Sequence, residues 1–326
     1  MILGLGRFEY YLIKLDDALL AATKTTNPAL YLHKNNTRTV LFMLQALAKL
    51  YAGMHNEKKF LKLKDNFKIL EDALGDVDHY DAIAKEFEAN KKIPRSIVTI
   101  LKQKTVTLID LLNQILLKKK WIKGNTLRTK KIRSKLVKMD WLEPKKEIES
   151  IKAFYIKEIK EVNIFYNEIE KPFIDIELQV HELRRKLRWL SIYAQALQGA
   201  IQFGTEEIAA AQYKKYLTKE IVKSPFNKLP MPGNNTATML INKNCFLALS
   251  FTINALGKLK DDGLKIFATK EALQQNKKIT EADLTKKALS INGLPSDGLN
   301  KLLTQANIIC KPFFEEEILN HLIAKK

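Results

Sequence analysis

Residues that build disulfide frameworks or interrupt helices are scarce in this 326-residue sequence. Its two cysteines, Cys245 and Cys310, are too few for a disulfide framework and wrongly spaced for a zinc site. Only 12 glycines and 9 prolines occur, so turn signals are rare over long stretches. No apolar run approaches the roughly 20 residues of a membrane span, and charges interrupt the N-terminal segment where a signal peptide would be apolar. We therefore expect a cytoplasmic protein without a membrane span.

Acidic residues are also scarce. Fifty-five Lys and Arg face 36 Asp and Glu, which leaves a formal charge of +19. No Asp or Glu occurs from Ala18 to Asn56, or from Leu111 to Met139. The second stretch holds Lys118, Lys119, Lys120, Lys123, Arg128, Lys130, Lys131, Arg133, Lys135 and Lys138. Such an excess opposes compact folding unless it faces a polyanion, which makes nucleic acid, polyphosphate or an anionic membrane surface candidate partners.

Apolar residues repeat at three- and four-residue spacing, which is the helical period. Examples run from Ile97 to Leu117 and from Ile148 to Ile169, whereas alternating strand patterns are almost absent. We predict an all-α protein. Pro144 divides it into an N-terminal half, residues 1–143, and a C-terminal half, residues 144–326. The one loop-rich segment, residues 224–236, has three prolines and a glycine, and its length is typical of functional or mobile loops.

The acid-free stretch contains a predicted amphipathic helix. Arg128, Lys131, Lys135 and Lys138 share one face, while Ile132 and Leu136 share another. Such a helix packs on a core through its apolar face and presents cations outward. A solvated surface helix would have the same pattern, but the absence of acids favours a binding face.

Two segments share an order of features that indicates an internal repeat. His33 and His181 each begin a predicted long helix with positive charge near its start. A Leu-Gly pair follows in each half, Leu74-Gly75 and Leu256-Gly257, and we interpret each pair as a turn followed by acidic residues. An internal repeat of roughly 150 residues predicts two similar bundles related by a pseudo-twofold axis.

In the second segment His181, Arg184 and Arg188 lie at i, i+3 and i+7, so one helix face presents all three, with Arg185 beside them. Guanidinium groups in a row suit the oxygens of a phosphate chain. The alternative is structural: histidines often cap helices, and Glu182 is placed to pair with Arg185 or Lys186.

The His-x-x-Arg helix start, its partial recurrence and the Leu-Gly-x-x-basic-Asp pattern resemble the CHAD (conserved histidine α-helical domain) family, from about Tyr31 onward. The resemblance implies that residues 1–326 form a single CHAD-like unit of two four-helix bundles about a pseudo-twofold axis. It also implies a basic cleft between the bundles that holds inorganic polyphosphate or a polyphosphate granule. The first half departs from the family pattern, with Asn36 and Val40 where the family usually has arginine, and Asp78-His79 where the second half has Lys260-Asp261. The polyphosphate-binding residues expected on this basis, with the basic helix extending the surface, are His33, Lys34, Arg38, Arg128, Lys131, Lys135, His181, Arg184, Arg185 and Arg188.

Motifs for catalysis are missing. Gly257-Lys258 lacks the Ser or Thr and the preceding glycine of a P-loop, and the His181 motif lacks the second histidine of a zinc protease. A tyrosine recombinase would need a C-terminal tyrosine, but none follows Tyr216. We therefore expect a non-catalytic protein with no cofactor and no metal.

Two other functions stay open. One is a nucleic-acid-binding helical protein, although Trp121 and Trp189 have apolar helical neighbours that indicate packing. The other is an enzyme acting on phosphoanhydrides. The oligomeric state is not predicted.

Overall fold

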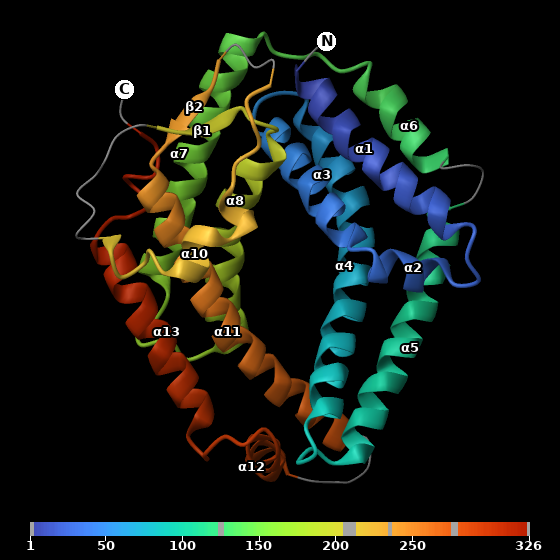
Figure 1. Ribbon diagram of the computed structural model, residues 1–326, viewed down its shortest axis with the longest axis vertical. Coiled ribbons are helices and arrows are strands. Elements are labelled where there is room, and N and C mark those ends of the chain that lie inside the picture. The colour runs from blue at the N-terminus through green and yellow to red at the C-terminus, as the bar shows by residue number, and fades with distance from the viewer. Residues whose placement is uncertain (1–2, 123–126, 205–212, 234–236, 275–279, 325–326) are drawn as a thin grey trace. The chain divides into compact units, whose positions relative to one another are not determined.

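Helices dominate the computed structural model, which describes residues 3–122, 127–204, 213–233, 237–274 and 280–324 (Figure 1). Within these ranges the named strands are two, β1 (Ile201–Phe203) and β2 (Met239–Ile241), paired in parallel. The prediction of an all-α protein is confirmed. No helix in the described ranges combines the length and the apolar character needed to cross a bilayer.

The chain forms two compact units. Unit 1 comprises Met1–Trp141 and Leu264–Ser296, and unit 2 comprises Leu142–Gly263 and Asp297–Lys326. The first division lies near the predicted one at Pro144, but unit 1 also takes a segment from the C-terminal half. The reason is α11 (Lys243–Gln274), whose C-terminal end packs with helices of unit 1.

Unit 1 is built mainly from neighbouring antiparallel helices. Its helices are α1 (Leu3–Ala22), α2 (Pro28–Lys34), α3 (Thr37–Ala52), α4 (Glu57–Ala89), α5 (Arg95–Lys118), α6 (Leu127–Leu136) and α12 (Glu281–Ile291). Asn27 caps α2 through its side chain, and Pro28 occupies the first turn, where a missing N–H costs nothing. Asn36 separates α2 from α3 because its φ of 52° is left-handed, a conformation that asparagine tolerates better than most residues.

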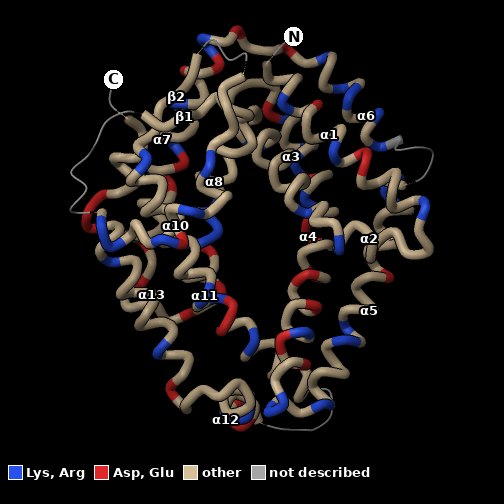
Figure 2. Tube along the Cα trace, viewed as in Figure 1, with Lys and Arg blue, Asp and Glu red and all other residues tan. Residues whose placement is uncertain are grey.

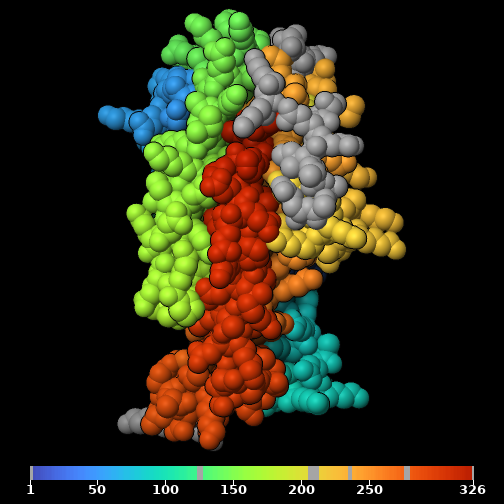
Figure 3. All heavy atoms as spheres, turned by 90° about the vertical axis from the view of Figure 1, so that its left-hand side faces the viewer, coloured from blue at the N-terminus to red at the C-terminus, as the bar shows by residue number. Residues whose placement is uncertain are grey.

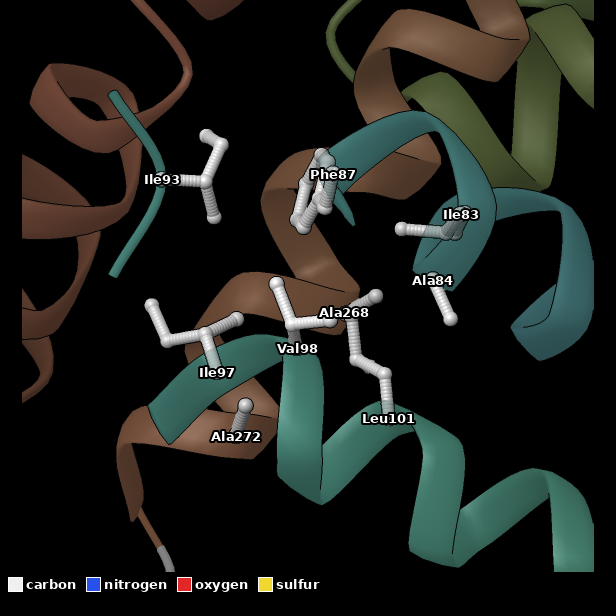
Figure 4. Packing of buried hydrophobic residues seen from close by; sticks show 9 residues of the cluster. All are labelled: Ile83, Ala84, Phe87, Ile93, Ile97, Val98, Leu101, Ala268 and Ala272. Carbon is white, nitrogen blue, oxygen red and sulfur yellow. The ribbon is translucent and has the colours of Figure 1, made fainter. Parts of the chain in front are cut away.

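The end of α11 is fixed in unit 1 by a cluster of buried apolar side chains (Figure 4). Phe87 of α4 and Leu101 of α5 are 3% and 1% exposed, and Ala268 and Ala272 supply the contact from α11. Figure 4 shows the two alanines lying between the helices, where their small side chains allow α11 to approach closely. A polar contact adds to this packing, because Glu271 accepts hydrogen bonds from Tyr80 and Lys104.

Unit 2 combines long helices with short helical segments and the two paired strands. They are α7 (Pro144–Glu168), the π-helix η1 (Ile176–His181), α8 (Glu182–Ala196), β1, α10 (Lys219–Lys223), the 3₁₀-helix η2 (Pro225–Asn227), β2, the first part of α11 and α13 (Gly298–Glu315). The red spheres of α13 run beside the yellow-green spheres of α7 in Figure 3, where the rings of Tyr166 and Phe314 stack. Between α7 and α8, the hydroxyl of buried Tyr193 donates to Glu158 Oε2 at 3.0 Å.

The predicted loop at 224–236 is described as far as Gly233, and residues 234–236 lie outside the described residues. After η2 its backbone is irregular but held in place. Gln195 Nε2 donates to the carbonyl oxygens of Phe226 and Lys228, and Gln202 Nε2 donates to that of Pro230. The loop is therefore fixed to the end of α8 and to β1.

Candidate functional site

His33 lies between two aspartates of α4. Its Nδ1 is 2.7 Å from Asp78 Oδ1, its Nε2 is 3.0 Å from Asp81 Oδ2, and the side chain is only 11% exposed. The prediction that His33 begins a long helix was wrong, because the left-handed Asn36 places His33 in the last turn of α2 and starts α3 afterwards. Both ring nitrogens are thus occupied by carboxylates of the same unit.

These contacts change the proton affinity of the ring. The hydrogen bond with Asp78 raises the pKa of His33 above its ordinary value of 6.5, and Asp81 adds to this effect while burial opposes it. For Asp81, burial alone would raise the pKa, but hydrogen bonds from Lys85 and His33 lower it. The charged imidazolium is consequently favoured near neutral pH, with its charge compensated on both sides.

We predict that the stability of unit 1 depends on pH through His33. Because the pKa is higher in the folded state, the stabilisation is complete below the unfolded pKa and is lost as pH rises through the folded one. Urea unfolding at pH 6 and pH 9 measures this, and the loss of stability at pH 9 should be larger in the wild type than in His33→Gln. An equal loss in the variant would assign the pH dependence to other groups.

Arg38, the second predicted ligand in the first half, also faces α4. Its Nε donates to Glu71 Oε1 at 2.7 Å and its Nη1 to Asp78 Oδ2 at 3.3 Å. The Glu71 side chain is 7% exposed and accepts a further hydrogen bond from Gln45. The guanidinium therefore neutralises a buried carboxylate. By contrast, the side chain of Lys34 is exposed and has no ion pair among the described residues.

The two Leu-Gly pairs have a different role from the predicted one. Both lie inside long helices, in α4 and α11, so the interpretation as turns was wrong. In each case an arginine side chain crosses the helix at the glycine. A Cβ on Gly75 would lie 2.5 Å from Arg38 Nη2, and a Cβ on Gly257 would lie 3.0 Å from Arg184 Nε. The glycines are needed for this close approach, which recurs in both units.

This geometry predicts opposing effects for Gly75→Ala. Alanine favours a helix by about 1 kcal/mol over glycine. Its Cβ, however, would displace the Arg38 guanidinium and weaken the contact with Glu71, which costs about 1.5–3 kcal/mol. Thermal or urea unfolding should show a net destabilisation of about 1 kcal/mol. Gly257→Ala should be milder because its contact is longer, whereas a stabilised Gly75→Ala would contradict the packing role of this glycine.

The His181 stripe of unit 2 is partly engaged in contacts along its own helix. His181 Nδ1 is 2.7 Å from Glu177 Oε1, and Arg185 Nη2 is 2.8 Å from Glu182 Oε2, the structural pairing that was weighed from the sequence. Arg184 packs on α11, where its Nε donates to the carbonyl oxygen of Ile253 at 3.2 Å, and burial lowers its pKa. Arg188 is half-buried. Part of this stripe thus stabilises the contact between α8 and α11.

Polar contacts attach the basic helix α6 to α1. Arg133 pairs with Glu9 at 2.8 Å and with Asp16, and Thr129 donates to Asp16 at 2.5 Å. Burial would lower the pKa of Arg133, but the hydrogen bonds that it donates to Glu9 and Asp16 raise it. Ile132, 3% exposed, packs inward on the apolar side. This fixes which face of α6 is directed outward.

Arg128, a predicted ligand at the start of α6, contacts other residues of unit 1. Its Nη2 donates to Asn66, and its guanidinium lies 5.8 Å from the centre of the Trp121 ring. Trp121 itself is 1% exposed, so the prediction that it packs in the core is confirmed.

Six further lysines of this region are exposed and form no ion pair with a described residue. Figure 2 shows Lys and Arg positions along α6 and no acidic position there. Lys131 and Lys135, both predicted ligands, are exposed, and Lys138 lies in the turn after the helix ends. The exposed lysines that form no ion pair with any described residue are Lys118, Lys120, Lys130, Lys131, Lys135 and Lys138. We call these six residues the α6 lysine surface.

Neither unit presents an obvious metal centre. In the ranges that the structure describes, no three His, Cys, Asp or Glu side chains are grouped so that they could hold a metal ion. Cys245 and Cys310 are both buried, and burial raises the pKa of the Cys310 thiol to about 12. A thiol with such a pKa is a poor nucleophile.

Comparison with known proteins found no match among family models, curated proteins or solved structures.

The residues that orient α6 were not identified from the sequence. Glu9 and Asp16 lie seven residues apart, which places them on one face of α1, and Thr129 and Arg133 are similarly aligned on α6. This matched spacing could have indicated the pairing. The pairing of His33 with acidic residues of α4 could not be predicted in this way, because no spacing in the sequence relates α2 to the middle of α4.

Proposed function

We propose that this chain is a non-catalytic binding protein for inorganic polyphosphate or a related phosphate polyanion. The observation that carries the proposal is the α6 lysine surface: six exposed lysines that form no ion pair with any described residue, in a stretch from Leu111 to Met139 that contains no acid. Exposed cations without acidic partners attract a polyanion, and its counterions are released on binding. Lysine serves here as a mobile point charge that tolerates any phosphate spacing.

The choice of polyphosphate among polyanions rests on the resemblance to the CHAD family. Support for the proposed repeat comes from the matching local order in the two units. In each, a short helical segment with a histidine in its last turn precedes a helix whose arginine crosses a glycine of a long helix. The proposed pseudo-twofold pair of bundles accounts for this order.

Contributions of the other predicted ligands differ in this proposal. Lys34 and Arg185 have side chains that face solvent, and they would add to the attraction. His33 and Arg38 are compensated by carboxylates, so they would act by holding α2 and α3 on α4. Arg184 would do the same for α8 on α11.

Nucleic acid is the second candidate partner. Single-stranded nucleic acid is held by bases stacking on exposed aromatic rings. Trp121 belongs to the same stretch as the α6 lysine surface, but it is buried and the Arg128 guanidinium lies over its ring. This favours a ligand that is recognised through phosphate alone, and leaves duplex DNA as the competitor to test.

The proposal is tested by titrating the protein with polyphosphate of several chain lengths while measuring phosphate release with magnesium or manganese. We expect affinity to rise with chain length and to fall steeply with salt, without sustained release. Sustained turnover would instead establish an enzyme acting on phosphoanhydrides, and an affinity independent of chain length would contradict a polyanion site.

A further inference from the structure

A second surface, in unit 2, has a different chemical character. On α10 and the loop after it, three large apolar side chains face solvent. Val222 is 51% exposed, Phe226 is 77% exposed and Met231 is 82% exposed. All three belong to one short segment, and exposed apolar residues that are grouped mark interaction sites more often than scattered ones do. We call the segment from Lys219 to Met231 the apolar loop.

The exposure of these side chains is imposed by a rigid backbone. The amides of Gln195 and Gln202 hold the loop carbonyl oxygens at 2.8–3.0 Å. Asn227, 6% exposed, donates its Nδ2 to the carbonyl oxygen of Ile221. Gly199, with φ of +85°, allows the loop backbone to pass, since a Cβ there would lie 2.1 Å from the carbonyl oxygen of Met231. A loop already ordered loses little conformational entropy when it binds a partner.

Cations surround the apolar side chains. Lys219, Lys223 and Lys228 are exposed and have no ion pair among the described residues. The acid within the loop is Glu220, which lies 3.8 Å from Lys258 and accepts a hydrogen bond from Asn254. This segment therefore carries both exposed apolar side chains and exposed lysines.

We propose that the apolar loop docks this protein on an anionic lipid bilayer. A bilayer interface accepts Phe and Met side chains without a preformed pocket. Its anionic headgroups also attract lysines that lie near the surface. A folded protein partner would need a cavity matched to Phe226 and Met231, and free polyphosphate offers nothing for them to contact. Phe226 and Met231 enter the interface, while Lys219, Lys223 and Lys228 meet the lipid phosphates.

The test is co-sedimentation with phosphatidylcholine vesicles, with and without phosphatidylserine. We expect the full chain to bind only the vesicles that contain phosphatidylserine. Phe226→Ser with Met231→Ser should bind them at least about tenfold more weakly, because most of the apolar contact is removed. The matched control is Ile174→Ser with Leu178→Ser, which removes two side chains exposed by 61% and 73% beside the acidic Asp175 and Glu177. This control should bind as the wild type does.

Circular dichroism and polyphosphate titration of the same variants separate this proposal from the one above. Both variants are expected to keep the helicity and the polyphosphate affinity of the wild type. Vesicle binding that is absent in the wild type, or equal in the loop variant and the wild type, would overturn the bilayer proposal. Loop-dependent self-association without vesicle binding would overturn it in favour of a second copy of this chain.

Discussion

Replacing Lys130, Lys131, Lys135 and Lys138 by glutamine is expected to weaken polyphosphate binding by at least about tenfold at low salt. These side chains are exposed and form no ion pair in the part of the chain that the structure describes, so their removal takes away attraction without leaving a buried acid there uncompensated. Because fewer counterions are then released, a plot of log affinity against log salt should also become shallower. Titrations at several salt concentrations measure both effects, and glutamine keeps a similar helix propensity.

A variant with the same change in net charge provides the control. Lys58, Lys59, Lys91 and Lys92 are exposed lysines of unit 1 that lie outside the acid-free stretch and have no ion pair among the described residues. Their replacement by glutamine should reduce affinity much less. An equal loss in both variants would mean that binding follows net charge alone, and no loss in either would remove the α6 lysine surface from the account.

The second large effect is expected on stability. Arg38→Met leaves the Glu71 carboxylate, 7% exposed, without the guanidinium that lies 2.7 Å away. Removing one partner of a buried ion pair costs several kcal/mol, and because Arg38 is 34% exposed we expect about 2–4 kcal/mol. Urea unfolding gives the value. Polyphosphate affinity, measured where the variant is folded, should not change.

A double-mutant cycle with Glu71→Gln separates the pair from its surroundings. If Arg38 acts through Glu71, the double variant should be less destabilised than the sum of the single variants, by roughly 1 kcal/mol or more. An Arg38→Met variant of normal stability that binds polyphosphate poorly would restore Arg38 as a ligand.

The helical class follows from short-range periodicity, and for this reason the sequence was sufficient to predict it. Ile132 and Leu136 are buried as their spacing indicates, and Lys131 and Lys135 are exposed on the other side. The same local pattern predicted the burial of Trp121. These features depend on residues within one or two helical turns of one another.

Errors arose where a residue's role depends on a distant helix. The sequence around Gly75 predicts a turn. In the structure Gly75 lies within an unbroken α4, where its lack of a Cβ makes room for Arg38. The sequence likewise predicts that a helix begins at His33, because it gives no sign that Asn36 adopts a left-handed conformation and ends α2. The partners of His33 and Arg38 lie some 33 to 48 residues away along the chain, and no local spacing identifies them.

The central claim is that the positive surface of this protein recognises a flexible phosphate chain. The most direct measurement is competition between long-chain polyphosphate and duplex DNA at equal phosphate concentration, with labelled polyphosphate bound to the wild-type protein. The account predicts that polyphosphate stays bound and that unlabelled polyphosphate displaces it at much lower concentration than DNA does. Displacement by DNA at the same phosphate concentration would contradict the account and identify a general nucleic-acid-binding surface.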